Sequence, residues 1–220
     1  MADGFTELID KSNEFFAELA NNNRKDWYEP RKAFYTAEIK KPAELLGEIL
    51  AEDISRRTGK PHKPKLFRIH RDVRFSKDKT PYNAHLHLMW AQGAEGSPAW
   101  FFGASPDYLI VGMGLMALRG ETLGKYRAFV DSYGNDLAAA IDTAAITAGA
   151  SISDWGPEPL KRVPKPYAPD HAHGDLLKRK ALALSAPLAE GWRAAGLVPA
   201  IQTTLKALLP VWTLIDAKMA

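Results

Sequence analysis

Hydrophobic residues recur every three to four positions over the first sixty residues, which is the spacing of one face of an α-helix. The spacing predicts a first helix that ends at the triplet Asn21–Asn23. Its inward positions are Phe5, Leu8, Ile9, Phe15, Phe16 and Leu19. A second helix is predicted over residues 24–41, with Pro30 in its first turn, where a missing N–H costs little. Its inward positions are Trp27, Phe34, Tyr35 and Ile39.

A third helix is predicted to open at Pro42 and to end before Gly59. Its inward positions are Leu45, Leu46, Ile49, Leu50 and Ile54. From residue 65 the pattern becomes strand-like, with short turn-forming segments between the runs. The four predicted strands cover residues 65–75, 82–92, 98–103 and 108–116.

Helical spacing returns in the second half of the chain. The predicted helices cover residues 121–132, 136–148 and 198–219, the last interrupted at Pro210, and residues 152–173 are Pro-rich and irregular. Helices, then strands, then helices is the order of an α+β fold. We therefore expect an antiparallel sheet formed by about residues 65–118, packed with N-terminal and C-terminal helices in a single domain, 1–220.

Charge is unevenly distributed, although the whole chain carries a formal net charge of only +3. From Arg56 to Lys79 there are ten Lys/Arg and two Asp, a local balance of +8. Clustered charge of one sign indicates the partner better than total charge does. The cluster therefore indicates an anionic partner.

Strand alternation sorts the charged residues onto faces. The predicted polar face of the first two strands carries Arg68, His70, Asp72, Arg74, His85 and His87. This face either meets water or lines a cleft. The next two predicted strands are apolar on both faces, so their sheet is expected to be covered on both sides, which favours the cleft. Alternation puts Arg71 on the apolar side, where a guanidinium needs an anionic partner. That partner is either a protein acid, near Asp72 or on a helix (Glu14 or Glu48), or a ligand anion.

The motif RDVRFSKDKTPYN, residues 71–83, resembles the signature of the domain-of-unknown-function family 2461. The segments FFAELANNNRKDWYEPRKAFY and KPYAPDHAHGDLLKRK are similar to other parts of that family, so the resemblance covers nearly the whole chain. It implies a single α+β domain and no particular activity. Two positions depart from the family pattern: Asn83 stands where lysine is usual, and Pro166 where glycine is usual.

Several chemistries find no support in the sequence. The absence of cysteine excludes disulfides, thiolate metal sites and thiol nucleophiles, and it fits a reducing cytoplasm. There is no Gly-rich phosphate loop and no nucleophile elbow. The segment Gly112–Gly114 lies within a predicted apolar strand and indicates a close-packing or bulge site. His85 and His87 could bind a metal together with His70 or Asp72, but neighbouring arginines would repel a cation. We expect no cofactor and no metal.

The favoured interpretation is a basic cleft, built on the Leu66–Trp90 hairpin, that binds a small phosphorylated or carboxylated ligand. The candidate binding residues are Arg68, Arg71, Asp72, Arg74, Lys77, Lys79, Tyr82, His85 and His87, with the two lysines closing over the ligand. Catalytic residues are not assigned, and an enzymatic reaction is left open. One alternative is nucleic-acid binding, disfavoured because Phe67, Phe75 and Tyr82 are expected in the core and because a net charge of +3 is modest for such a protein. The other is a structural or protein-interaction module braced by internal salt bridges. No membrane segment is expected, and the oligomeric state is unknown.

Overall fold

The computed structural model describes residues 4–94 and 96–219. These residues divide into two compact units, which are described separately. The first unit consists of residues up to Trp90, Phe101–Ile110 and Leu188–Gln202. The second consists of Ala91–Trp100, Val111–Pro187 and the residues from Thr203 onward. The single domain expected from the sequence stays a prediction.

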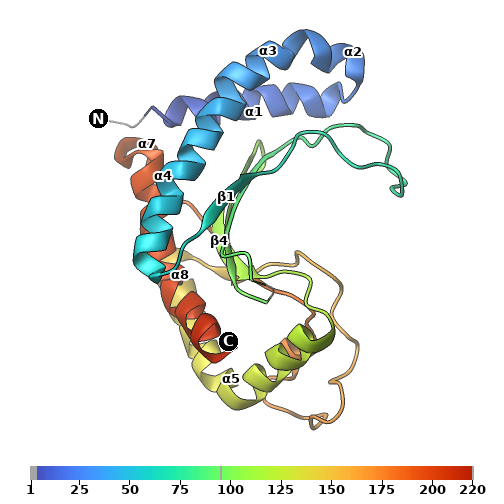
Figure 1. Cartoon of the computed structure of the whole chain (residues 1–220), viewed down its shortest axis with the longest axis vertical. Helices are drawn as coiled ribbons and strands as arrows, with labels where there is room; N and C mark the ends of the chain where they lie inside the picture. The colour runs from blue at the N-terminus through green and yellow to red at the C-terminus, as the bar shows by residue number, and fades with distance from the viewer. Residues whose placement is uncertain (1–3, 95, 220) are drawn as a thin grey trace. The chain divides into compact units, whose positions relative to one another are not determined.

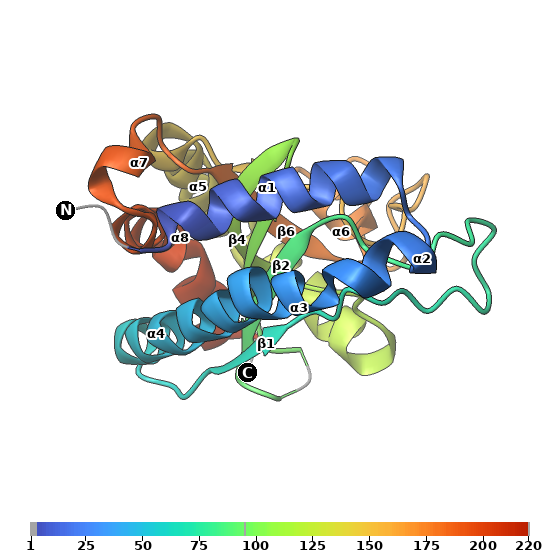
Figure 2. The ribbon, with the colours of Figure 1, turned by 90° about the horizontal axis from the view of Figure 1, so that it is seen from above.

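The first unit begins with helix α1, Thr6–Asn21, whose buried face includes the predicted Leu8, Phe16 and Leu19. A nearly continuous helical run follows in Figures 1 and 2. It consists of α2 (Lys25–Tyr28), the 3₁₀ turn η1 (Glu29–Arg31), α3 (Lys32–Phe34), the π-helical turn η2 (Tyr35–Lys40) and α4 (Lys41–Thr58).

The predicted third helix corresponds to α4, which begins at Lys41, one residue before Pro42, and follows η2 without a break in the helical run. Pro42 lies in the first turn of α4, directly after η2. At the end of η2 the N–H of Lys41 bonds back to the carbonyl of Thr36, five residues earlier. A π turn interrupts the regular i→i−4 ladder, and it therefore tolerates a residue that has no N–H to donate.

The inward face of this run is partly as predicted. Trp27, Tyr35, Ile39, Leu46, Leu50 and Ile54 are buried, but Phe34, Leu45 and Ile49 are exposed. Gly59 ends α4 with φ +69°, a left-handed conformation that suits glycine.

The strands form one six-stranded antiparallel sheet in the order β1-β2-β3-β4-β6-β5, which confirms the α+β class. Their bounds are β1 Lys63–Leu66, β2 Leu86–Ala91, β3 Ala99–Ser105, β4 Tyr108–Leu115, β5 Ser151–Ile152 and β6 Leu182–Pro187. Two of the strands come from outside residues 65–118, so the sheet is larger than the predicted central segment. Within β4 close packing is confirmed at Gly114, where a Cβ would lie 2.1 Å from the carbonyl oxygen of Leu182.

The first predicted strand is wrong beyond Leu66, and the second begins only at Leu86. We call the intervening residues 67–85 the hairpin loop. One isolated bridge, His70 to Tyr82, holds its two arms together. Backbone bonds join Phe67 N to His87 O (2.9 Å) and Asn83 N to Ile69 O (2.7 Å), so the second arm contains two more residues than the first between these bonds. This surplus and the missing N–H of a proline in the turn prevent a regular ladder.

The second unit is built around helix α5, Gly120–Ala148, which is kinked at Tyr133. It also contains α6, Gly174–Lys178, and a stack of Trp100 on Trp212 with ring centroids 6.1 Å apart. α7, Trp192–Ala195, belongs to the first unit, whereas α8, Leu197–Lys218, has residues in both.

Helix α8 continues through Pro210, so the predicted interruption there is wrong. By length and composition alone α8 could cross a membrane, but 44% of its apolar stretch is buried inside the protein. Core helices of soluble proteins pass the same test. The expectation that no segment spans a membrane stays a prediction.

Candidate functional site

Arg71 is bound within the hairpin loop. Its Nη1 donates to Asp78 Oδ2 (2.5 Å) and to the carbonyl of Thr80 (3.1 Å), and it also contacts the Thr80 hydroxyl. The Thr80 N–H and then the Arg71 guanidinium lower the pKa of Asp78 to about 2. The Arg71 side chain is 24% exposed, so it is less buried than strand alternation predicts. Its acid is Asp78, and neither a neighbour of Asp72 nor a helix glutamate takes that position.

Two further cations of the hairpin loop also have partners inside it. Arg74 forms a fork with Asp72, through Nε to Oδ1 (2.9 Å) and Nη2 to Oδ2 (2.7 Å), and this bond lowers the pKa of Asp72. Lys79 Nζ donates to the carbonyl of Val73 (3.0 Å). By contrast, the side chain of Lys77 makes no hydrogen bond or ion pair with any residue that the structure describes. The loop therefore neutralises much of its own charge.

Tyr82 anchors the hairpin loop to the helices of the first unit. Asn23, from the triplet that ends α1, accepts the Tyr82 N–H (3.0 Å) and donates to the Tyr82 carbonyl (2.9 Å). The ring of Tyr82 is buried and lies 4.4 Å from that of Tyr28. The side chain of Asn23 thus satisfies both backbone groups of Tyr82, as a neighbouring strand would in a regular ladder.

His85, the last residue of the hairpin loop, and His87 of β2 form a separate cluster. The rings of His85 and His87 are stacked with centroids 3.9 Å apart, and His87 Nε2 lies 2.7 Å from the hydroxyl of Tyr108. Burial, and secondarily His85, lower the pKa of His87 to about 4, so it is neutral at pH 7. No group of three or more potential metal ligands occurs among residues 4–94 and 96–219. His87 is engaged with a phenol here.

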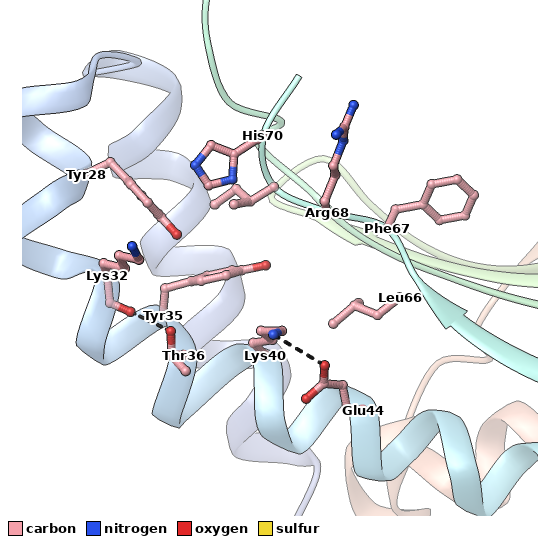
Figure 3. Close-up of a pocket in the computed structure, with 11 residues that line it drawn as sticks. Tyr28, Lys32, Tyr35, Thr36, Lys40, Glu44, Leu66, Phe67, Arg68 and His70 are labelled. Carbon is pink, nitrogen blue, oxygen red and sulfur yellow. Dashed lines mark hydrogen bonds and ion pairs between the residues drawn. The ribbon is translucent and has the colours of Figure 1, made fainter. Parts of the chain in front are cut away.

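A pocket of about 220 Å³ lies between the helical run and the start of the hairpin loop, entirely within the first unit (Figure 3). Its lining comes from residues 28–44 and 66–70. Tyr28 and Tyr35 are 2% and 5% exposed, and their hydroxyls point toward the middle of the pocket in Figure 3. Neither hydroxyl forms a hydrogen bond with a residue that the structure describes. Burial raises the pKa of both phenols, which keeps both hydroxyls protonated at neutral pH.

Cationic side chains surround these two phenols. Lys32, Lys40 and Arg68 line the pocket together with His70, and one acid, Glu44, pairs with Lys40 at 3.6 Å. The side chains of Lys32 and Arg68 have no ion-pair partner in the described part of the chain. Arg68 stands at the rim in Figure 3. The pocket therefore combines two neutral donors with a positive surrounding.

Of the predicted site residues, only Arg68 lines this pocket. Arg71 pairs with Asp78, Arg74 pairs with Asp72, and Lys79 donates to the loop backbone. His85 and His87 form their own cluster. The predicted list omits Tyr28, Lys32, Tyr35, Lys40 and His70, which the structure brings to the pocket. The signal for the first four was a helix with phenols on its inner face and lysines nearby, but helical spacing alone reads such phenols as core.

Fold and site together define an α+β protein with a small basic pocket between a helical run and a β-hairpin. The family model described as a conserved hypothetical protein (DUF2461) matches residues 11–213, and the chain belongs to this family. A search of curated proteins finds no match.

Proposed function

We propose that this protein binds a small anionic ligand, phosphorylated or carboxylated, in the pocket of Figure 3. The observation that carries the proposal is the pair of hydroxyls on Tyr28 and Tyr35, which open into the pocket from largely buried side chains and bond to no residue that the structure describes. Most polar groups of largely buried side chains bond to the protein, so two donors that face the pocket without such a bond are available to a ligand. Two phenols that donate to one acceptor fit a phosphate or carboxylate oxygen.

Electrostatics supports the same class of ligand. Lys32, Lys40 and Arg68 bring three positive charges to the pocket against one carboxylate, Glu44. Hydrogen bonds to an ionised acceptor are roughly twice as strong as neutral ones. The volume of about 220 Å³ is below the range of drug-sized ligand pockets, which favours an anion with few additional atoms. The absence of cysteine supports a reducing compartment, the cytoplasm, as the place of action.

Thermal unfolding with added anions tests the proposal. Inorganic phosphate, sulfate, acetate and citrate are compared with sodium chloride of equal ionic strength, so that screening is held constant. An anion present at 100 times its Kd should stabilise the native protein by about 2.7 kcal/mol. The double variant Tyr28→Phe with Tyr35→Phe should fold and lose most of this gain.

The matched control is Tyr126→Phe, which removes a buried hydroxyl of the second unit that does have a protein partner. This variant should keep the full response to the anion. The proposal fails if no anion stabilises the wild type beyond chloride, or if the double variant responds as the wild type does.

A further inference from the structure

Two aromatic rings of the hairpin region lie at the surface. Phe75 is 96% exposed and Phe67 is 43% exposed, so the expectation that both belong to the core is wrong. Within the first unit, Figures 1 and 2 show the tip of the hairpin loop projecting beyond α2. One objection to nucleic-acid binding was that the aromatic residues near the basic cluster belong to the core. That objection no longer holds for Phe67 and Phe75, whereas Tyr82 is buried as expected.

Each exposed ring has a cation beside it. Lys65 Nζ lies 5.1 Å from the ring centroid of Phe67, and the guanidinium carbon of Arg74 lies 5.9 Å from that of Phe75. Lys77, two residues after the second ring, is exposed and has no partner among the described residues. Both acids of the loop, Asp72 and Asp78, already form ion pairs with its arginines. Exposed aromatic rings and positively charged side chains are therefore neighbours in the hairpin region.

The same internal bonds give the loop tip a defined shape. The pair of Arg71 with Asp78 and the bond from Lys79 to the carbonyl of Val73 join residues on opposite sides of the tip. A binding loop that is already ordered loses less entropy when its partner arrives. Phe75 is thus presented on a braced backbone.

We propose that the hairpin loop binds single-stranded nucleic acid, with unpaired bases stacked on Phe75 and Phe67 and phosphates held by Lys77 and Lys65. An aromatic ring stacks on any base, and lysines follow the repeating phosphates, which is how strands are bound without sequence readout. A membrane surface fits less well, because the neighbours of Phe75 are Arg74 and Ser76 and offer no contiguous apolar area. In a duplex the bases are stacked on one another, so their faces are not accessible to either ring.

Fluorescence anisotropy with a labelled 20-nucleotide oligothymidine tests the proposal on the full chain. Phe75→Leu keeps an apolar side chain but removes the ring, and it should weaken binding about 5- to 150-fold. Phe34→Leu makes the same change at another exposed aromatic, in α3, and should change affinity less than about twofold. Because the ring of Phe75 is exposed, the urea unfolding midpoint of Phe75→Leu should equal that of the wild type.

Salt dependence provides the second measurement. The logarithm of affinity should fall linearly with the logarithm of salt concentration, by about 0.7 per phosphate contact. Lys77→Glu should reduce that slope by about one contact, whereas Lys206→Glu, on α8, should leave it unchanged. Phe75→Trp should retain binding, and the new indole should lose fluorescence when the strand binds.

Three results would overturn this assignment. The first is no binding of the strand at 50 mM salt, and the second is equal affinity of Phe75→Leu and Phe34→Leu. The third is binding to phosphatidylserine vesicles without binding to the strand, because the anionic partner would then be a membrane surface. The Tyr28→Phe, Tyr35→Phe double variant should bind the strand as the wild type does, so failure of the pocket proposal and failure of this one are distinguishable.

Discussion

Removing the hydroxyl from each of two buried tyrosines should lower stability in one case and leave it nearly unchanged in the other. Tyr126 is fully buried, and its hydroxyl donates to the carbonyl of Leu176 at 3.1 Å. Tyr35 is nearly as buried, but its hydroxyl opens into the pocket and bonds to no described residue. Burial raises the pKa of both phenols, so both are neutral donors at pH 7. The two Tyr→Phe substitutions therefore differ mainly in whether a protein hydrogen bond is lost.

The structure sets the size of the effect at Tyr126. The carbonyl of Leu176 also accepts the backbone N–H of Arg179 at 3.0 Å, so Tyr126→Phe does not leave this acceptor without a partner. The expected loss is that of one ordinary hydrogen bond, about 0.5–1.5 kcal/mol. For a chain of this length this corresponds to a fall in Tm of about 1–6 °C. Tyr35→Phe should change the free energy of unfolding by less than about 0.5 kcal/mol.

Urea unfolding followed by tryptophan fluorescence measures both variants, because the chain contains six tryptophans. The wild type and the two variants are compared in chloride buffer without other anions, so that no ligand occupies the pocket. If Tyr35→Phe destabilises the protein as much as Tyr126→Phe does, its hydroxyl has a protein partner in solution. The reasoning behind the pocket proposal would then be refuted.

Two further predictions concern the packing of α5 and the pH dependence of stability. A Cβ on Gly134 would lie 2.2 Å from the ring of His173, so Gly134→Ala should cost about 1–3 kcal/mol of unfolding free energy, and His173→Ala should reverse most of that cost in a double-mutant cycle. Additive effects in urea unfolding would contradict this packing. His87 has a folded pKa of about 4, below its unfolded value of about 6.5, so its contribution to stability is complete above pH 6.5 and is lost as the pH falls toward 4. Between pH 7 and 4.5 the wild type should lose about 1–3 kcal/mol more than His87→Gln, and parallel stability curves would contradict this.

The α+β class could be predicted because long helices and apolar strands carry strong periodic signals. The long helices α1, α5 and α8 all lie in segments with clear helical spacing. β6 was not predicted, because six residues with a burial pattern that is almost entirely inward show no alternation. β5 has two residues, too few for any period to be detected.

The hairpin loop shows why the site was harder to predict than the fold. Its apolar and polar residues alternate as in a strand, yet local pairs such as Arg71 with Asp78 hold the backbone in an irregular form. The alternation of side chains along a strand cannot predict an ion pair between two residues that lie seven positions apart across a turn. Nor can spacing distinguish a buried tyrosine that packs from one whose hydroxyl lines a pocket, which is why Tyr28 and Tyr35 were missed.

The π-helical turn η2, Tyr35–Lys40, affects how this chain is compared with its relatives. Such a turn contains one residue more than the α-helical turn it replaces, and one residue corresponds to a rotation of about 100°. A relative with a regular helix here therefore aligns correctly only with a one-position gap inside η2. If that gap is placed elsewhere, Thr36 and Lys40, which line the pocket, are matched with residues from a different side of the relative's helix.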